Sequence, residues 1–204
     1  INGSVILKNL NAGDGSISAG YGNTNLTVAD GAELYVNEGQ KSVNLGATGS
    51  LTVNGHMECI GGTVTAGTTS GSIVVTSPNT LLADVVKTAS LVVSNGRVEV
   101  KTLKADSVTV QNSGSVTVTV AVTGQAGTSA ATIVVSGSTS SLNASSATVN
   151  ANVSAVNGAT VNVGSSEDSQ VTVESMSVGK QPATRDEVQS IMNDSSVEKN
   201  KWYT

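Results

Sequence analysis

Most of this 204-residue chain alternates between an aliphatic residue and a small polar one, which is the pattern of a β-strand with one buried face. Asn- and Gly-rich breaks separate the alternating runs. No segment before about residue 183 has the 3.6-residue period of an amphipathic helix. The clearest runs are 51–53, 98–100, 108–110, 116–122, 147–153, 161–163 and 171–173. These short and frequent strands predict an all-β fold.

The core that these strands enclose must be filled without aromatic rings. The chain has no Phe, one Trp and three Tyr, and only 12% of its residues are charged. Val, Leu, Ile and Ala suit a narrow core in which short strands stack directly above one another. An immunoglobulin-like sandwich normally places a large aromatic residue between its sheets. We therefore predict a long, thin molecule rather than a round one.

Parts of the chain repeat, which is typical of a solenoid. The segment 87–93 (KTASLVV) aligns with 104–110 (KADSVTV), and 143–149 (NASSATV) is a looser third copy. The interval from the second copy to the third is not a multiple of the interval from the first to the second, so the coil length varies. We predict a parallel, right-handed β-helix over residues 1–178, with coils of roughly 17–25 residues. A pair of antiparallel β-domains with Greek-key turns is the alternative.

The breaks between the runs have the composition of tight turns. Four of them contain an Asn followed closely by a Gly, and such pairs supply the positive φ that tight turns need. They are Asn54-Gly55, Asn95-Gly96, Asn112-Ser113-Gly114 and Asn157-Gly158. Because identical polar residues can stack in adjacent strands, we expect the Asn side chains to form ladders along the rod.

The last part of the chain, 179–204, changes character and predicts a linker followed by a short C-terminal α-helix. Thr184 and Glu187 fit the two ends of a capping box. The helix would either cover the open last coil or dock onto another protein. In the second case the candidate partner contacts are Val188, Ile191, Met192, Trp202 and Tyr203.

Few residues could carry chemistry. His56, Glu58 and Cys59 lie close together in the sequence, but on a strand Cys59 would face away from the other two. The chain has no further His or Cys to complete a metal site, and Cys59 fits a buried core position better. Glu99 and Asp106 lie on adjacent segments and are the carboxylates that could come near one another, although a solvated surface explains them as well. We therefore predict no catalytic residue, no metal and no cofactor.

Two further motifs carry little information. Thr63/Thr65 and Thr117/Thr119 are Thr-x-Thr pairs, but an ice-binding face needs regular ranks of such pairs on successive coils. Asn-x-Ser/Thr sequons occur about as often as chance predicts, so they permit glycosylation without indicating it. These sequons begin at Asn2, Asn25, Asn143, Asn152 and Asn193.

Charge and hydropathy limit the classes of partner. A net charge of −5 argues against a nucleic-acid partner, which needs clustered Lys and Arg. No apolar run approaches the roughly 18 residues that a membrane span requires, so we expect no membrane insertion. A protein partner or self-association is the expectation that remains, and a glycan is possible.

The Val-, Thr-, Asn- and Gly-rich strands of residues 43–178 resemble the β-solenoid segments of bacterial surface adhesins, phage fibre-type proteins and bactofilins. The stretch 182–188 (PATRDEV) is similar to helical joints in phage structural proteins. The resemblance implies a non-enzymatic rigid spacer, attachment or lattice element on a cell surface or virion. A chain that starts at Ile1 without a signal peptide fits a processed product or a piece of a longer protein.

Two alternatives follow from the same resemblance. Bactofilin-like proteins polymerise end to end, which would make the chain an intracellular filament-forming scaffold. Other β-helices bind or cleave polysaccharides, which would make it a carbohydrate-active protein.

Overall fold

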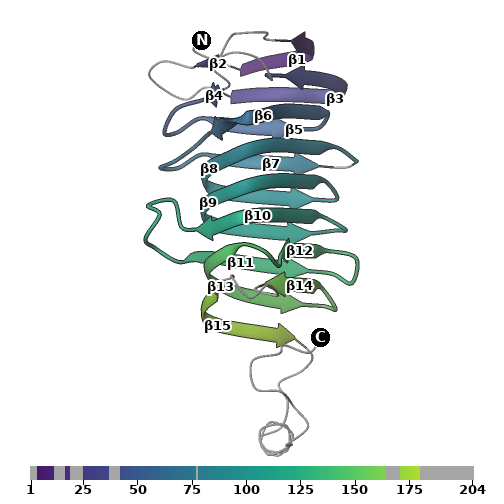
Figure 1. The fold of residues 1–204 in the computed structure, drawn as a ribbon. Coiled ribbons are helices and arrows are strands. Elements are labelled where there is room, and N and C mark those ends of the chain that lie inside the picture. The colour runs from purple at the N-terminus through teal and green to yellow at the C-terminus, as the bar shows by residue number, and fades with distance from the viewer. Residues whose placement is uncertain are drawn as a thin grey trace, which may run out of the picture.

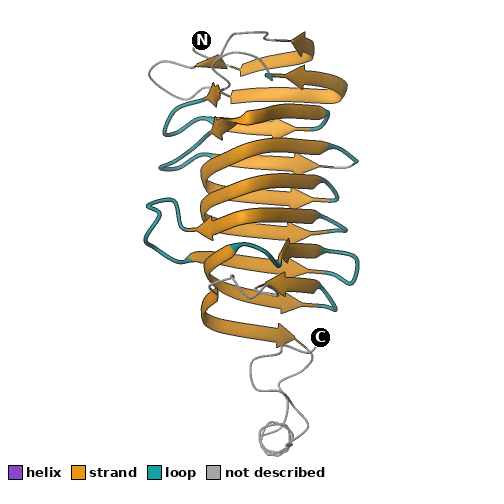
Figure 2. Ribbon diagram, viewed as in Figure 1, coloured by secondary structure: helices purple, strands orange, loops and turns teal. Residues whose placement is uncertain are grey.

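The chain forms a column of stacked β-strands in a computed structural model (Figure 1). The structure describes residues 4–11, 17–18, 25–36, 42–76, 78–163 and 171–179, with side chains for 25–36, 42–76 and 78–163. All regular elements in these ranges are strands, as Figure 2 shows. The expected C-terminal helix and its candidate contacts Val188, Ile191, Met192, Trp202 and Tyr203 lie outside the described residues. The described part contains no helix with the length and apolarity that a membrane crossing requires.

The strands pair in parallel throughout. Their bounds are β1 Ser4–Asn11, β2 Ile17–Ser18, β3 Asn25–Tyr35, β4 Ser42–Asn44, β5 Ser50–Val53, β6 His56–Thr65, β7 Ser72–Thr76, β8 Thr80–Ser94, β9 Arg97–Gln111, β10 Ser115–Thr123, β11 Ala131–Ser136, β12 Ser141–Ala144, β13 Thr148–Val156, β14 Thr160–Val163 and β15 Val171–Gly179. The antiparallel contact that is present is an isolated bridge between Thr76 and Asn95. The predicted parallel β-solenoid is therefore confirmed, and the antiparallel Greek-key alternative is wrong. The right-handed sense of the coil stays a prediction.

Each coil has three sides. In β8 the inward–outward alternation breaks at 84–85 and again at 89–90, where two consecutive residues are half-buried. These breaks are corners, and β9 repeats them one level along the column, at 101–102 and 106–107. We call the sides face A (33–35, 56–59, 80–83, 97–100, 115–118, 141–144 and 160–163), face B (42–44, 63–65, 85–88, 102–105, 121–123 and 148–149) and face C (25–28, 50–53, 72–76, 90–94, 107–111, 131–136 and 151–156).

The length of a coil varies, as the spacing of the repeats predicts. One inward ladder on face C runs through Leu26, Leu51, Ile73, Leu91, Val108, Ile133 and Val153. Its shortest step is 91–108, and its longest steps are 26–51 and 108–133. Extra residues lie at corners and turns, so the strands keep their register while the coil length changes.

The core is narrow and aliphatic. A second ladder on face C consists of six valines in successive coils, each of them fully buried: Val28, Val53, Val75, Val93, Val110 and Val135. Aliphatic side chains fill the space between the three sides of the coil, and none of the buried core residues is aromatic. Cys59 occupies an inward position on face A and is also fully buried, as predicted.

The first two copies of the repeat lie one above the other, whereas the prediction that 143–149 is a third copy is wrong. Lys87 pairs with Lys104 and Leu91 with Val108, so 87–93 and 104–110 run from face B to face C in adjacent coils. By contrast, 143–149 runs from face A to face B, where Val149 pairs with Val122. Alternation marks the inward residues of a strand but does not say which of the three sides the strand occupies.

In two turns from face C to face A, Asn and Gly have different structural roles. Asn95 has φ of 61° and Asn112 has φ of 50°, whereas Gly96 and Gly114 do not have positive φ. A Cβ on Gly114 would lie 2.5 Å from the Val93 carbonyl oxygen of the coil above, so this glycine permits close approach. The Asn-Gly pairs form turns as predicted, but in these two turns the positive φ is supplied by Asn95 in the first and by Asn112 and Ser113 in the second.

At two of the turns, contacts between Asn and Ser take the place of the expected Asn ladders. The side-chain amide of Asn112 donates to Ser94 Oγ at 3.0 Å, and that of Asn157 donates to Ser136 Oγ at 3.0 Å. Asn79 Nδ2 donates to the Asn54 carbonyl oxygen. These contacts link one coil to the next at the same edge of the column.

Candidate functional site

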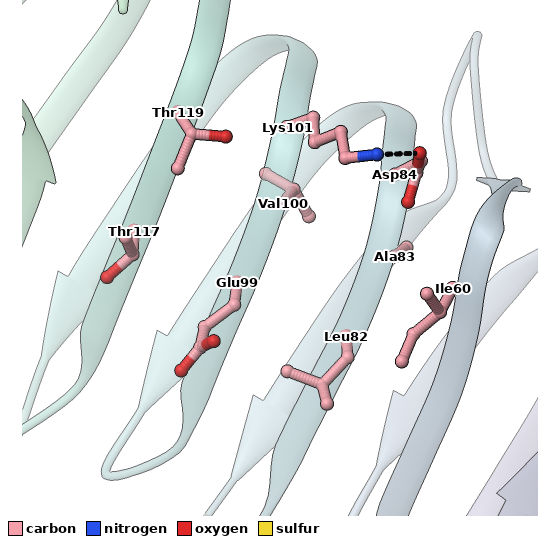
Figure 3. Close-up of a pocket in the computed structure, with 9 residues that line it drawn as sticks. All are labelled: Ile60, Leu82, Ala83, Asp84, Glu99, Val100, Lys101, Thr117 and Thr119. Atoms are coloured by element: carbon pink, nitrogen blue, oxygen red, sulfur yellow. Dashed lines mark hydrogen bonds and ion pairs between the residues drawn. The ribbon is translucent and has the colours of Figure 1, made fainter. Parts of the chain in front are cut away.

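A hollow of about 240 Å³ lies where face A meets face B, in the middle of the column (Figure 3). Apolar side chains, two threonines and three charged side chains line it. The main lining residues are Ile60, Leu82, Glu99, Lys101, Thr117 and Thr119. This volume is below the roughly 300 Å³ at which small-molecule pockets begin, so the hollow suits one side chain of a partner better than a whole ligand.

The hollow exists because the A–B corners differ in length. β8 and β9 turn this corner with a single residue, Asp84 and Lys101 respectively. β6 uses the three residues 60–62, and β10 uses the two residues 119–120. The two short corners are therefore recessed between two longer ones. Ile60 is 49% exposed and Val120 is 54% exposed on the longer corners, and they are the exposed large hydrophobic residues in the described ranges.

Cations hold both carboxylates of the hollow. Lys101 Nζ donates to Asp84 Oδ2 at 2.6 Å, and Asp84 Oδ1 accepts from the backbone N–H of Gly61 at 2.7 Å. The guanidinium of Arg97 pairs with Glu99. The contacts of Asp84 connect successive coils, and the Arg97–Glu99 pair joins neighbouring outward positions on one strand. Such contacts are typical of charged side chains on the outside of a stack of strands. The arrangement favours contact with an apolar group over proton transfer.

Glu99 and Asp106 are not brought together. Glu99 lies on face A, whereas Asp106 lies at the corner between faces B and C, with residues 102–105 of face B between them. Asp106 Oδ1 accepts from the backbone N–H of Gln125 at 2.8 Å. The prediction that these two carboxylates come near one another is therefore wrong, because one whole side of the triangle separates them.

Gln125 makes a contact that spans several coils. Its side-chain amide donates to the Thr68 carbonyl oxygen at 2.6 Å, far back in the chain. Thr68, Ala89, Asp106 and Gln125 follow one another at the B–C corner of successive coils. The start of the 124–130 loop therefore braces the column across the levels of Ala89 and Asp106.

His56 and Glu58 share the outer side of face A, and Cys59 faces the core, as the strand geometry predicts. His56 Nε2 lies 2.7 Å from Glu58 Oε1, and the His56 ring lies 5.7 Å from the Tyr35 ring on the previous coil. Desolvation, a hydrogen bond with Glu33 and the charges of Glu33 and Glu58 raise the pKa of Tyr35. Among the described residues, no three His, Cys, Asp or Glu side chains are placed to hold a metal ion.

The remaining motifs fall on separate sides. Thr63 and Thr65 lie on face B, whereas Thr117 lies on face A and Thr119 at its corner, so the two pairs do not form one rank. Three of the five sequons can be placed: Asn25 and Asn143 are exposed and Asn152 is half-buried. Asn2 and Asn193 lie outside the described residues.

Sequence reasoning missed one large surface. We call it the C surface, and it consists of the outward side chains of face C: Asn25, Thr27, Ser50, Thr52, Ser72, Val74, Thr76, Ser90, Val92, Ser94, Ser107, Thr109, Gln111, Thr132, Val134, Ser136, Asn152, Ser154 and Val156. None of them is charged. The alternating runs contain this signal, but it becomes visible only when each run is assigned to a side.

Comparison of the chain with protein-family models, with curated proteins and with solved structures found no match.

Proposed function

We propose that the chain is a non-enzymatic structural protein, a β-solenoid that is displayed on a cell surface or virion as a rigid spacer, attachment or lattice element. The observation that supports this function is the unbroken register of the column. Six consecutive steps carry Leu26 to Val153 along one inward ladder without a break. No described side-chain cluster offers a competing chemistry of comparable extent.

Stiffness follows from the three-sided ladder. On each face, an inner strand segment bonds through its backbone to one segment above and one below, and inward side chains pack on those of both neighbours. Bending the column would open the hydrogen bonds on one side while compressing the side chains on the others. A rod of this kind holds its two ends at a constant separation, which is the property that a spacer needs.

Display outside a cell exposes a protein to proteases. Lys87, Arg97, Lys101 and Lys104 all lie within the paired strands β8 and β9, where cleavage requires local opening of the stack. The cleavage sites for a trypsin-like protease in this part of the chain are therefore protected. This protection supports a location at an envelope or particle surface.

The spacer function can be tested by a distance measurement between two spin labels. Ser42 and Thr148 are joined by five register steps on face B, through Thr63, Val85, Thr102 and Ala121. At ~4.8 Å per step, their Cα atoms lie ~24 Å apart along the column. We expect one narrow distance distribution for labels on Ser42→Cys and Thr148→Cys, with buried Cys59 replaced by Ala as a control. A broad or multimodal distribution under native conditions would contradict a rigid spacer.

The display itself is tested by antibodies raised against the column. Labelling of intact source cells or particles is expected, and labelling only after lysis would contradict surface display. A glycan array with Glu99→Gln as the comparison tests the carbohydrate alternative. Glycan binding that this substitution abolishes would favour that alternative over a mechanical function.

One observation favours the filament-forming scaffold as a second candidate. Among the described strands, β1 and β2 at one end and β14 and β15 at the other each pair with a single strand, which leaves unpaired strand edges at both ends of the column. Two parallel edges of the same kind can join head to tail, and this contact propagates. Electron microscopy of the purified chain distinguishes the two functions, because the scaffold predicts long filaments and the spacer predicts separate short rods.

A further inference from the structure

The C surface differs from the other two sides of the column in its charge. The charged residues whose side chains the structure describes are Asp30, Glu33, Glu58, Asp84, Lys87, Arg97, Glu99, Lys101, Lys104 and Asp106. All of them lie on face A, on face B or at corners. Seven coils of face C carry none. Covering the C surface would therefore bury no charge, whereas covering face A would bury four charged side chains and covering face B would bury two.

The C surface also carries side chains of similar size along its middle. Its central outward ladder consists of Thr27, Thr52, Val74, Val92, Thr109, Val134 and Ser154. Six of these seven residues are β-branched, so a ridge of methyl groups runs along the middle of the face. Ser, Thr, Asn, Gln and Val flank it. Two sheets that pack face to face at about 10 Å need facing side chains of this kind.

The area of the C surface is sufficient for a pair. Seven strands at ~4.8 Å cover ~34 Å along the column, and five residues at ~3.3 Å cover ~17 Å across it. Two such faces together bury about 1,100 Å², just above the roughly 1,000 Å² that a specific interface needs. The paired state is therefore expected to be reversible and to depend on concentration.

We propose that the C surface is a self-association face, through which two copies of this chain pack side by side as a dimer. The occupant is a second copy because the surface is complementary to itself: it is uncharged, built from the same small residues along its whole length, and large enough for a pair. A two-fold axis in the plane of the interface brings the middle of one face onto the middle of the other. Val92 is the fourth of the seven residues in the central ladder, so it meets Val92 of the second copy whether the two rods run in the same or opposite directions.

The proposal does not depend on where the chain is displayed, and it is tested by sedimentation velocity over a concentration series. The wild-type chain is expected to shift from monomer to dimer. Val92→Lys places a charge at the centre of the interface and is expected to weaken dimerisation by at least tenfold. Thr102→Lys, which places the same charge outward on face B, is the matched control and is expected to leave dimerisation unchanged. Circular dichroism verifies that both variants are folded.

A disulfide test uses the same geometry. Val92→Cys is expected to form an intermolecular disulfide under mild oxidation, and Thr102→Cys is not, while Cys59 is fully buried in both variants. A wild-type chain that stays monomeric at all concentrations would overturn the proposal, even if the C surface bound another ordered surface such as ice. Equal dimerisation of the two lysine variants would overturn it as well.

Discussion

At the scale of the residue, close packing between coils decides which amino acid a turn accepts. Gly114 and Gly127 look alike in the sequence, because each lies beside short polar residues between two strands. Gly127 has φ of +81° and no atom within 4 Å of where its Cβ would be. Gly114 has an ordinary φ, but its Cβ would meet the backbone of the previous coil. Gly127 is therefore required by its positive φ, and Gly114 by the close approach of the neighbouring coil.

This difference predicts two unequal substitutions. Gly114→Ala places its methyl group 2.5 Å from the Val93 carbonyl oxygen, so one coil must move away from the other. We expect a loss of about 3 kcal/mol of unfolding free energy, against about 1 kcal/mol for Gly127→Ala, which meets only the cost of a positive φ. Urea unfolding followed by circular dichroism measures both. Equal losses would contradict the steric role of Gly114.

The sequence predicted the turn positions but not the task of each residue within them. Local composition marks a turn, because Asn and Gly are common there for several different reasons. Whether a glycine serves φ or close approach depends on the coil above it, which lies one full coil away in the chain. That neighbour is identified only once the strands are in register.

At the scale of the element, a strand is stabilised by its place in an inward ladder. Val85 and Val86 are adjacent on β8, and they have opposite environments. Val86 is fully buried between Val64 and Leu103, whereas Val85 lies outward between Thr63 and Thr102 and is half-buried. Strand geometry places adjacent residues on opposite sides, and the structure shows which valine faces inward and what its partners are.

Truncation of the two valines is therefore expected to have different effects. Val86→Ala removes two buried methyl groups from the ladder and leaves a cavity, which costs about 2 kcal/mol. Val85→Ala is expected to cost about 0.5 kcal/mol, because its methyl groups are partly solvated in the folded state. The same urea unfolding measurement applies. A Val85→Ala variant less stable than Val86→Ala would show that the two faces of β8 have been assigned the wrong way round.

The loop after β10 is held by the hydrogen bond between the Gln125 N–H and Asp106 Oδ1, and this contact can be tested on its own. Asp106→Ala removes the acceptor of the Gln125 N–H, so we expect the 124–130 loop to open more often. Hydrogen exchange measured by mass spectrometry is expected to become faster in peptides that cover 124–130 and to stay unchanged in 107–111. Ser107→Ala, at the neighbouring outward position, serves as the control. Faster exchange throughout β9 would instead assign Asp106 a role in the stability of the whole coil.

The candidate hollow was beyond sequence reasoning for an element-scale reason. It depends on the unequal lengths of four successive corners, at 60–62, Asp84, Lys101 and 119–120. A corner residue looks like any other break in alternation until the strands on both sides are aligned with their neighbours. The fold needed only the alternation, the absence of large rings and one clean repeat between 87–93 and 104–110, which are local properties of the sequence.

At the scale of the whole molecule, the column is a series of interchangeable coils. β8 and β9 keep one constant register from Thr80↔Arg97 to Ser94↔Gln111, with no irregularity on any of the three sides. Each coil contacts the coil above and the coil below, so the stability of a solenoid is close to a sum over neighbours. A coil can therefore be removed if the register of all three ladders is preserved.

Deletion of residues 89–105 tests this modularity. It removes one whole coil and joins Thr88 to Asp106, so that Ser107 takes the place of Ser90, and Val108 and Val110 take the inward positions of Leu91 and Val93. We expect a folded column that is one level shorter, with the Ser42–Thr148 label separation reduced from ~24 Å to ~19 Å. The loss of stability should be that of one coil and its interface.

Deletion of residues 89–97 is the matched control, because it removes a shorter segment but disrupts the register of the inward ladders. The chain after the junction would then place Thr102 at the inward position of Val93 and turn Leu103 to the outside. A shift of the register by one residue moves every side chain of a strand to the opposite face. We therefore expect this shorter deletion to unfold the coils that follow it. If the two deletions were equally stable, the column would not be held by the register of its inward ladders, and neither its stiffness nor the alignment of the outward ladders on the C surface would follow from that register.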